Sequence, residues 1–185
     1  MRILGIDPGS SVTGYGVVAR VGGELVHVAS GTVRPPREDS LPVRLHFVYV
    51  ALEEVIRQHR PDAAVVEQVF VATSPRSALV LGQARGVALA ALAAGAVAVS
   101  EYAATSIKQA VTGSGRAPKS QVQRMVRRLL ALDSTPASDA ADALAAAICH
   151  AHASRILALG GGPRPARRPA RRPAPRGLPR ARPAR

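Results

Sequence analysis

The sequence predicts a single α/β domain built on a mixed five-stranded sheet with helices on both faces. Three short strand patterns joined by tight turns open the chain, and helical and strand patterns alternate after residue 40. Strands joined by tight turns pair antiparallel, whereas strands separated by helices pair in parallel through crossovers that cover one face of the sheet. At 185 residues, one sizeable core is expected and two large lobes would not fit.

The first three strands are expected to form an antiparallel meander. Residues 2–7, 13–21 and 24–34 show the patterns of strands, and Gly22-Gly23 marks a hairpin between the last two. The first strand ends in ILGIDPGSSVTGYG, where Asp-Pro-Gly favours a turn. We expect Gly9, Gly14 and Gly16 to keep this hairpin slim.

Helices and strands alternate in the rest of the chain. Apolar residues recur at intervals of three and four from Leu41, which predicts an amphipathic helix ending near His59. The continuous apolar run DAAVVEQVF predicts a central strand. The remaining predicted elements are a helix over residues 77–94, a strand over 96–102, a short helix over 105–113, a helix after the loop GSGRAPK and a last helix from about Ser138.

The positive charge is concentrated at the end of the chain. The net charge is +13, but residues 161–185 carry nine arginines and no acid, so the rest of the chain is only mildly basic. We predict a folded domain over residues 1–158 and a disordered Pro/Ala/Arg-rich tail over 159–185, because the tail has almost no large apolar side chain to bury. This tail is either a passenger or a weak electrostatic tether for DNA.

Cysteine content and hydropathy indicate a cytoplasmic protein without a membrane span. Cys149 is the only cysteine, which excludes an intramolecular disulfide and a cysteine-rich zinc site. Gln83 and Arg85 interrupt the longest apolar stretch, which a bilayer would not readily accept. No secretory segment is expected before Asp7.

Four acidic residues are placed where they can act together. Asp7 ends the first strand and Glu67 ends the central strand, so parallel pairing would bring both to one edge of the sheet. Asp139 and Asp142 are three residues apart and lie on the same side of the last helix. Each acid alone has a plain structural explanation as a turn residue, a strand end or a helix N-terminus, but Glu67 interrupts a strand that is otherwise predicted to be buried.

A cluster of oxygen ligands suits hard cations such as Mg²⁺ or Mn²⁺. Two such ions would clamp the attacking water and the leaving oxygen of a phosphodiester displacement. The sequence therefore favours metal-dependent phosphodiester chemistry, and it leaves open which acid holds which ion.

Six ordered motifs resemble those of the RuvC family of Holliday-junction resolvases. They are LGIDPGSSVTGYGVV, VVEQVF, SALVLGQARGVA, SIKQAV, KSQVQRMVRRLL and SDAADALAAAICH, and they cover residues 2 to about 155. The resemblance implies an RNase H-like fold and a structure-selective endonuclease that nicks two opposing strands of a four-way DNA junction, leaving 5′-phosphate and 3′-hydroxyl ends. It assigns the catalytic and metal-binding roles to Asp7, Glu67, Asp139 and Asp142.

The carboxylate cluster predicts two Mg²⁺ per subunit, with Mn²⁺ as a substitute, and the resemblance implies a homodimer. With DNA as the ligand, Gly9, Gly14 and Gly16 are expected to leave room beside Asp7 for its backbone. The partners that the resemblance implies are a junction-binding protein and a hexameric branch-migration ATPase.

Lys108 and Lys119 are candidates for neutralising DNA phosphates, the latter at a predicted helix start. Phe70 is a candidate for stacking on a DNA base, or else it packs in the core. The helix around residues 79–92 is expected to form part of the dimer interface or to pack on its own sheet.

Three alternatives remain. An actin-like or sugar-kinase-like ATP phosphotransferase also begins with a strand, an Asp and a Gly/Ser/Thr-rich hairpin, but it needs two lobes and a second glycine-rich loop. A small RNase H-like nuclease acting on RNA would share Asp7 and one later acid. A non-catalytic basic binding module would leave the charge of Glu67 unexplained.

Overall fold

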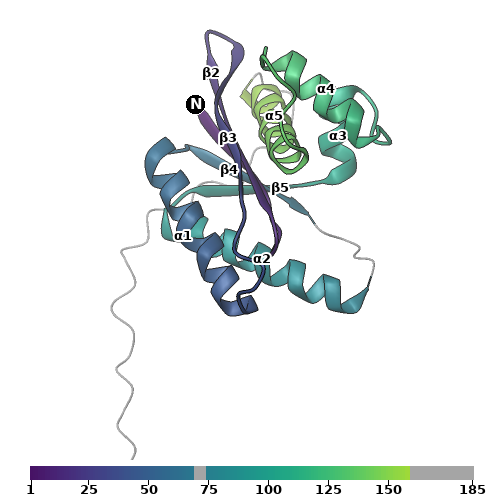
Figure 1. The fold of residues 1–185 in the computed structure, drawn as a ribbon. Coiled ribbons are helices and arrows are strands. Elements are labelled where there is room, and N and C mark those ends of the chain that lie inside the picture. Colours follow the sequence, from purple (N-terminus) through teal and green to yellow (C-terminus); the bar gives the residue numbers. More distant parts are fainter. Residues whose placement is uncertain (69–73, 159–185) are drawn as a thin grey trace, which may run out of the picture.

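The computed structural model describes residues 1–68 and 74–158, and it confirms the mixed sheet with the strand order β3-β2-β1-β4-β5 (Figure 1). The observed elements follow the predicted order and differ from the predicted bounds by at most a few residues. They are β1 Arg2–Asp7, β2 Thr13–Val21, β3 Glu24–Val33, α1 Leu41–His59, β4 Ala63–Gln68, α2 Pro75–Ala94, β5 Ala98–Ala103, α3 Ala104–Thr112, α4 Lys119–Leu129 and α5 Ser138–Ala158.

The strand pairing is antiparallel in the first half of the sheet and parallel in the second. β1 pairs antiparallel with β2, and β2 with β3, while β1, β4 and β5 run parallel. Ile6 of β1 lies opposite Val66 of β4, so the next residue on each strand is an acid, Asp7 or Glu67. The parallel register therefore brings the carboxyl ends of β1 and β4 to the same edge of the sheet.

Helices cover both faces of the sheet, as predicted (Figure 1). Leu4 and Ile6 of β1 pack in one core with α1 and α2, whereas Ile3 packs in a second core with α3, α4 and α5. Side chains alternate between the two faces of a strand. Asp7 and Glu67 therefore share the face that α5 covers.

Glycines in β1 and β2 allow α5 to lie close to the sheet. A Cβ on Gly5 would overlap the carbonyl oxygen of Ala143, and one on Gly14 would overlap the carbonyl oxygen of Asp139. A Cβ on Gly16 would lie 2.6 Å from Cγ of Leu144. The expectation that Gly14 and Gly16 leave room for DNA is thus wrong, because α5 fills that space.

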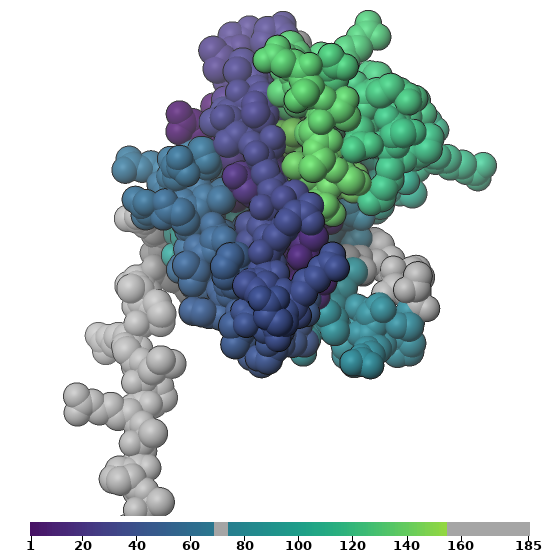
Figure 2. Space-filling model, in the orientation of Figure 1, coloured from purple at the N-terminus to yellow at the C-terminus, as the bar shows by residue number. Residues whose placement is uncertain are grey.

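The helix α2 has the composition of a membrane span. It is the one helix within residues 1–68 and 74–158 that is long and apolar enough to cross a membrane by these criteria alone. In the structure it packs against α1, and its Arg85 forms an ion pair with Glu101 of β5. In Figure 2, which keeps the orientation of Figure 1, the green residues of α3 and α4 form an outer edge of the molecule.

Candidate active site

Three of the four predicted acids line one cleft at the carboxyl edge of the central strands. Asp7 comes from β1, Glu67 from β4 and Asp142 from the second turn of α5. The cleft has a volume of about 170 Å³, and Lys108 of α3 and Lys119 of α4 line it with the acids. The structure therefore brings both predicted lysines to the predicted carboxylates.

Lys119 provides positive charge inside this cleft. Its Nζ donates a hydrogen bond to Oδ2 of Asp142 at 2.9 Å. This bond raises the pKa of Lys119, and the neighbouring Asp7 and Asp139 add to the effect. Lys119 is the first residue of α4, so its charge reaches Asp142 from a helix that packs directly against α5.

Asp7 carries the most unfavourable charge of the cluster. Burial, the largest cause, and the carboxylates of Asp142 and Glu67 together raise its pKa from 3.8 to about 7, although Lys119 opposes them. A carboxylate in this environment gains free energy from an added cation, because the cation offsets both the lost hydration and the like-charge repulsion.

Glu67 is in the same electrostatic situation in milder form. Burial and the charge of Asp142 raise its pKa, while Lys119 and Lys108 lower it. The prediction that Glu67 interrupts a buried strand is confirmed, since the preceding residues Ala64, Val65 and Val66 are fully buried.

Asp139 lies at the margin of the site. It precedes Asp142 by one helical turn but does not line the cleft. Its Oδ2 lies 3.9 Å from a guanidinium nitrogen of Arg34, which follows β3. The negative charge of Asp139 still raises the pKa of Asp7, so Asp139 affects the cluster by electrostatic repulsion without lining the cleft.

Arg44 contacts the turn that follows Asp7, and the sequence interpretation missed this residue. From the first turn of α1 its guanidinium donates to the carbonyl oxygen of Ser10 at 2.6 and 3.0 Å, and to the hydroxyls of Ser10 and Ser11. A cation in a first helical turn is unfavourable to the helix dipole. This unfavourable position in the helix was the signal in the sequence that the Arg44 side chain contacts residues outside α1.

The turn after Asp7 is held by side chains from two elements. Thr13 of β2 is fully buried, and its hydroxyl donates to the carbonyl oxygen of Gly9 at 2.7 Å and accepts from the Gly9 N–H at 3.2 Å. Within the described residues, no backbone-to-backbone hydrogen bond closes the segment from residue 8 to residue 12. Thr13 and Arg44 therefore hold the turn that follows Asp7.

The chemistry of the donors fits a hard divalent cation. All candidate ligands are carboxylate oxygens, and Lys119 only partly offsets the burial and like-charge repulsion at Asp7. Among the residues that the structure describes, no three Asp, Glu, His or Cys side chains are close enough to hold one ion. Mg²⁺ commonly uses one or two carboxylates and completes its shell with water and substrate phosphates, so this donor set suits it.

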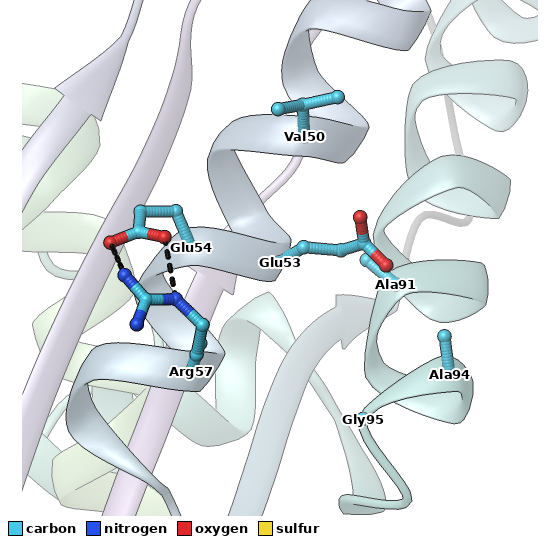
Figure 3. Close-up of a pocket in the computed structure, with 7 residues that line it drawn as sticks. All are labelled: Val50, Glu53, Glu54, Arg57, Ala91, Ala94 and Gly95. Carbon is cyan, nitrogen blue, oxygen red and sulfur yellow. Dashed lines mark hydrogen bonds and ion pairs between the residues drawn. The ribbon is translucent and has the colours of Figure 1, made fainter.

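A second hollow, between α1 and α2, does not have the chemistry of an active site (Figure 3). It has a volume of about 400 Å³ and lies on the face of the sheet opposite α5. Glu54 and Arg57 pair with each other there at 2.6 Å, and Glu53 extends from α1 toward α2. The Arg57 hydrogen bond lowers the pKa of Glu54, so these two charges neutralise each other and neither is left to act on a ligand.

Phe70, the predicted stacking residue, lies outside the described residues.

Known proteins resemble this chain over most of its length. A family model described as crossover junction endodeoxyribonuclease RuvC matches residues 3–150. A protein of that name from Burkholderia mallei is 53% identical over 90% of this chain and 92% of its own length. One from Alkalilimnicola ehrlichii is 60% identical over 82% of this chain and 91% of its own length.

Solved structures agree with these relatives. Thermus thermophilus RuvC, in complex with a Holliday junction substrate, superposes with a TM-score of 0.80 and 34% identity over 87% of this chain and 97% of its own. The yeast mitochondrial Holliday junction resolvase Ydc2 shares the fold, with a TM-score of 0.64 and 14% identity over 86% of this chain and 81% of its own. The architecture is thus RNase H-like, and the chain belongs to the RuvC family of crossover junction endodeoxyribonucleases.

Proposed function

We propose that this protein is a structure-selective endonuclease that nicks two opposing strands of a four-way DNA junction, leaving 5′-phosphate and 3′-hydroxyl ends. The observation that carries the proposal is the cleft in which Asp7, Glu67 and Asp142 face Lys108 and Lys119. Carboxylates with adjacent lysines suit a phosphodiester because the acids can hold cations while the lysines attract the phosphate. Membership of the RuvC family supports the choice of a DNA junction as substrate.

Asp7, Glu67 and Asp142 are the proposed ligands for two Mg²⁺ ions, for which Mn²⁺ would substitute, and Asp139 is a proposed ligand at the margin. When bound, such ions supply Lewis-acid stabilisation of the charge on the reacting phosphate and activate the attacking water. Lys108 and Lys119 place positive charge where charge develops on the phosphate oxygens. Arg44 acts as a positioning residue, because it holds the turn that follows Asp7.

Substrate comparison tests this proposal. Equal concentrations of a four-way DNA junction, a linear duplex of one arm's sequence and a structured RNA are incubated with the protein in Mg²⁺. We expect paired, symmetry-related nicks in the junction, products that a ligase rejoins, and little cleavage of the other two. Preferential cleavage of the RNA would support a small RNA-directed nuclease. Junction binding without cleavage would support a non-catalytic module.

The ATP phosphotransferase alternative has no support in the structure. Residues 1–68 and 74–158 form a single five-stranded sheet, whereas such an enzyme needs two lobes.

A homodimer is proposed because two symmetric nicks require two equivalent sites. Its proposed interface is the outer side of α2, where Leu79 is 71% exposed and Gly82 and Gly86 form a small stripe one turn apart. A glycine inside a helix costs about 1 kcal/mol relative to alanine. A Cβ on either glycine would meet nothing within 4 Å, so the fold of one chain does not need them. Close approach of the α2 helix of a second subunit would explain why glycine stands at both positions.

A double substitution, Gly82→Leu with Gly86→Leu, tests this interface. We expect a monomer by sedimentation at micromolar concentration, an unchanged fold by circular dichroism, and loss of paired nicking. A matched variant, Ala93→Leu, carries the same side chain at an exposed position in the last turn of α2. If the wild-type protein sediments as a pure monomer, the dimer proposal is wrong.

We propose a nuclease domain over residues 1–158, activity in the cytoplasm, and cooperation with a junction-binding protein and a hexameric branch-migration ATPase. Residues 159–185 lie outside the described residues. Deleting residues 161–185 and measuring junction affinity against salt distinguishes a DNA tether from a passenger. Deletion of a tether would lower the salt dependence, whereas deletion of a passenger would leave it unchanged.

A further inference from the structure

A groove on the outer side of α4 is lined by three arginines. We call it the arginine groove; its volume is about 480 Å³ and its lining consists of Arg124, Arg127, Arg128, Ala131 and Leu132. It lies outside the catalytic cleft, which α4 reaches with its first residue, Lys119. Figure 2 shows this green segment at an open edge of the molecule, with side chains projecting into solvent.

The three arginines have different surroundings. Arg127 donates to the carbonyl oxygens of Leu132 at 3.2 Å and Asp133 at 3.1 Å, and thereby holds the loop that forms one wall. Arg124 and Arg128 are exposed, and their guanidinium groups form no hydrogen bond or ion pair with any residue that the structure describes. The guanidiniums of Arg124 and Arg128 are thus available to a ligand, beside the loop that Arg127 holds in place.

The helix pattern explains why these charges face outward. Val122 and Val126 of α4, four residues apart on the helix, are buried against α5. Arg124 and Arg128 follow each of them by two residues, which places them on the opposite side of the helix. The core therefore gives no reason for a basic residue at either position.

The position of the groove suggests an extended anionic ligand. Arg127 lies eight residues after Lys119, which corresponds to about 12 Å along the helix axis. That length equals about three to four base pairs of a DNA duplex. A small anion in the cleft could not reach the groove, whereas a DNA arm could contact both.

We propose that the arginine groove binds backbone phosphates of a junction arm, outside the catalytic cleft. This inference rests on the proposed function, since it takes the DNA junction as the ligand. Because the groove is open and its polar groups are guanidiniums, it contacts phosphates, and such contacts position the DNA without reading its sequence. It contributes affinity and orientation for the arm that leaves the cleft.

The test uses the full-length protein and a four-way junction in EDTA, so that binding is measured without cleavage. Arg124→Gln with Arg128→Gln should lower the slope of log Kd against log salt by about 2, since each neutralised phosphate contributes about 0.9. We expect the Kd at physiological salt to rise about tenfold or more. Arg124→Lys with Arg128→Lys should restore most of the slope, because lysine also neutralises a phosphate.

The matched control is Arg57→Gln with Arg60→Gln. It also removes two positive charges, at the C-terminal end of α1 on the other face of the sheet. It should leave the slope unchanged. If the Arg124/Arg128 variant and this control show equal slopes of log Kd against log salt, the proposal that the arginine groove binds DNA is wrong, while the proposed function still stands. Failure of the wild-type protein to bind the junction at all would overturn the proposed function and the groove together.

Discussion

Asp7→Asn should abolish catalysis and, in the absence of metal, stabilise the fold. The substitution removes the charge that burial and the carboxylates of Asp142 and Glu67 disfavour, and it keeps the size of the side chain. The pKa of Asp7 rises from 3.8 to about 7. Each pKa unit corresponds to about 1.36 kcal/mol, so ionised Asp7 lowers the free energy of unfolding by about 4 kcal/mol.

The sign of the pH dependence follows from the direction of this shift. Below pH 3.8 Asp7 is protonated in both the folded and the unfolded state, so its charge costs nothing. Between pH 3.8 and about 7 only the unfolded state loses the proton, and the stability of the wild-type protein falls relative to the variant. Above pH 7 the difference is constant.

Urea denaturation in EDTA measures this difference. At pH 8 the Asp7→Asn variant should be about 2–4 kcal/mol more stable than the wild type, and at pH 5 the gain should be clearly smaller. Asp133→Asn is the matched control, because Asp133 is exposed in the loop before α5. Its effect should stay within about 0.5 kcal/mol. A variant at position 7 that is no more stable than the wild type at pH 8 would refute the reasoning.

Three further predictions concern the turn, the glycines and the metal. Gly14→Ala should destabilise the protein by about 2 kcal/mol or more in urea denaturation, since its Cβ overlaps α5, whereas Gly82→Ala in open space should not destabilise the isolated subunit. Arg44→Ala should slow single-turnover cleavage about tenfold or more while Arg57→Ala leaves it unchanged; equal rates for both would remove Arg44 from the site. Mg²⁺ at about 100 times its Kd should stabilise the wild type by about 2.7 kcal/mol and the Asp7 variant by less, and calorimetric unfolding with and without EDTA measures both.

Most of the fold could be predicted from the sequence because local patterns and chain connectivity agree. The meander requires only short turns, and the parallel half follows from strands separated by helices. The closeness of Asp7 and Glu67 follows from their positions at strand ends, and it is confirmed by the register of β1 with β4, in which the preceding residues Ile6 and Val66 are partners. The two lysines came to the same cleft because α3 and α4 pack beside α5.

Contacts between elements far apart in the sequence were the part that could not be predicted. Gly14 was assigned to DNA clearance, since strand alternation shows which face a residue takes but not which helix covers that face. Arg44 reaches a turn more than thirty residues earlier, and no local pattern encodes that contact. Asp139 shares a side of α5 with Asp142, yet one helical turn is enough to bring it to Arg34.

Single-turnover cleavage of a four-way junction by wild-type and Asp7→Asn protein in Mg²⁺ tests the central claim most directly. The claim is that the cleft of Asp7, Glu67 and Asp142 cuts junction DNA. Paired nicks should form with the wild type and with the Asp133→Asn control, and the Asp7→Asn variant should bind the junction but cut it at least about a hundredfold more slowly. Cleavage by the Asp7→Asn variant at a rate near that of the wild type would contradict the account.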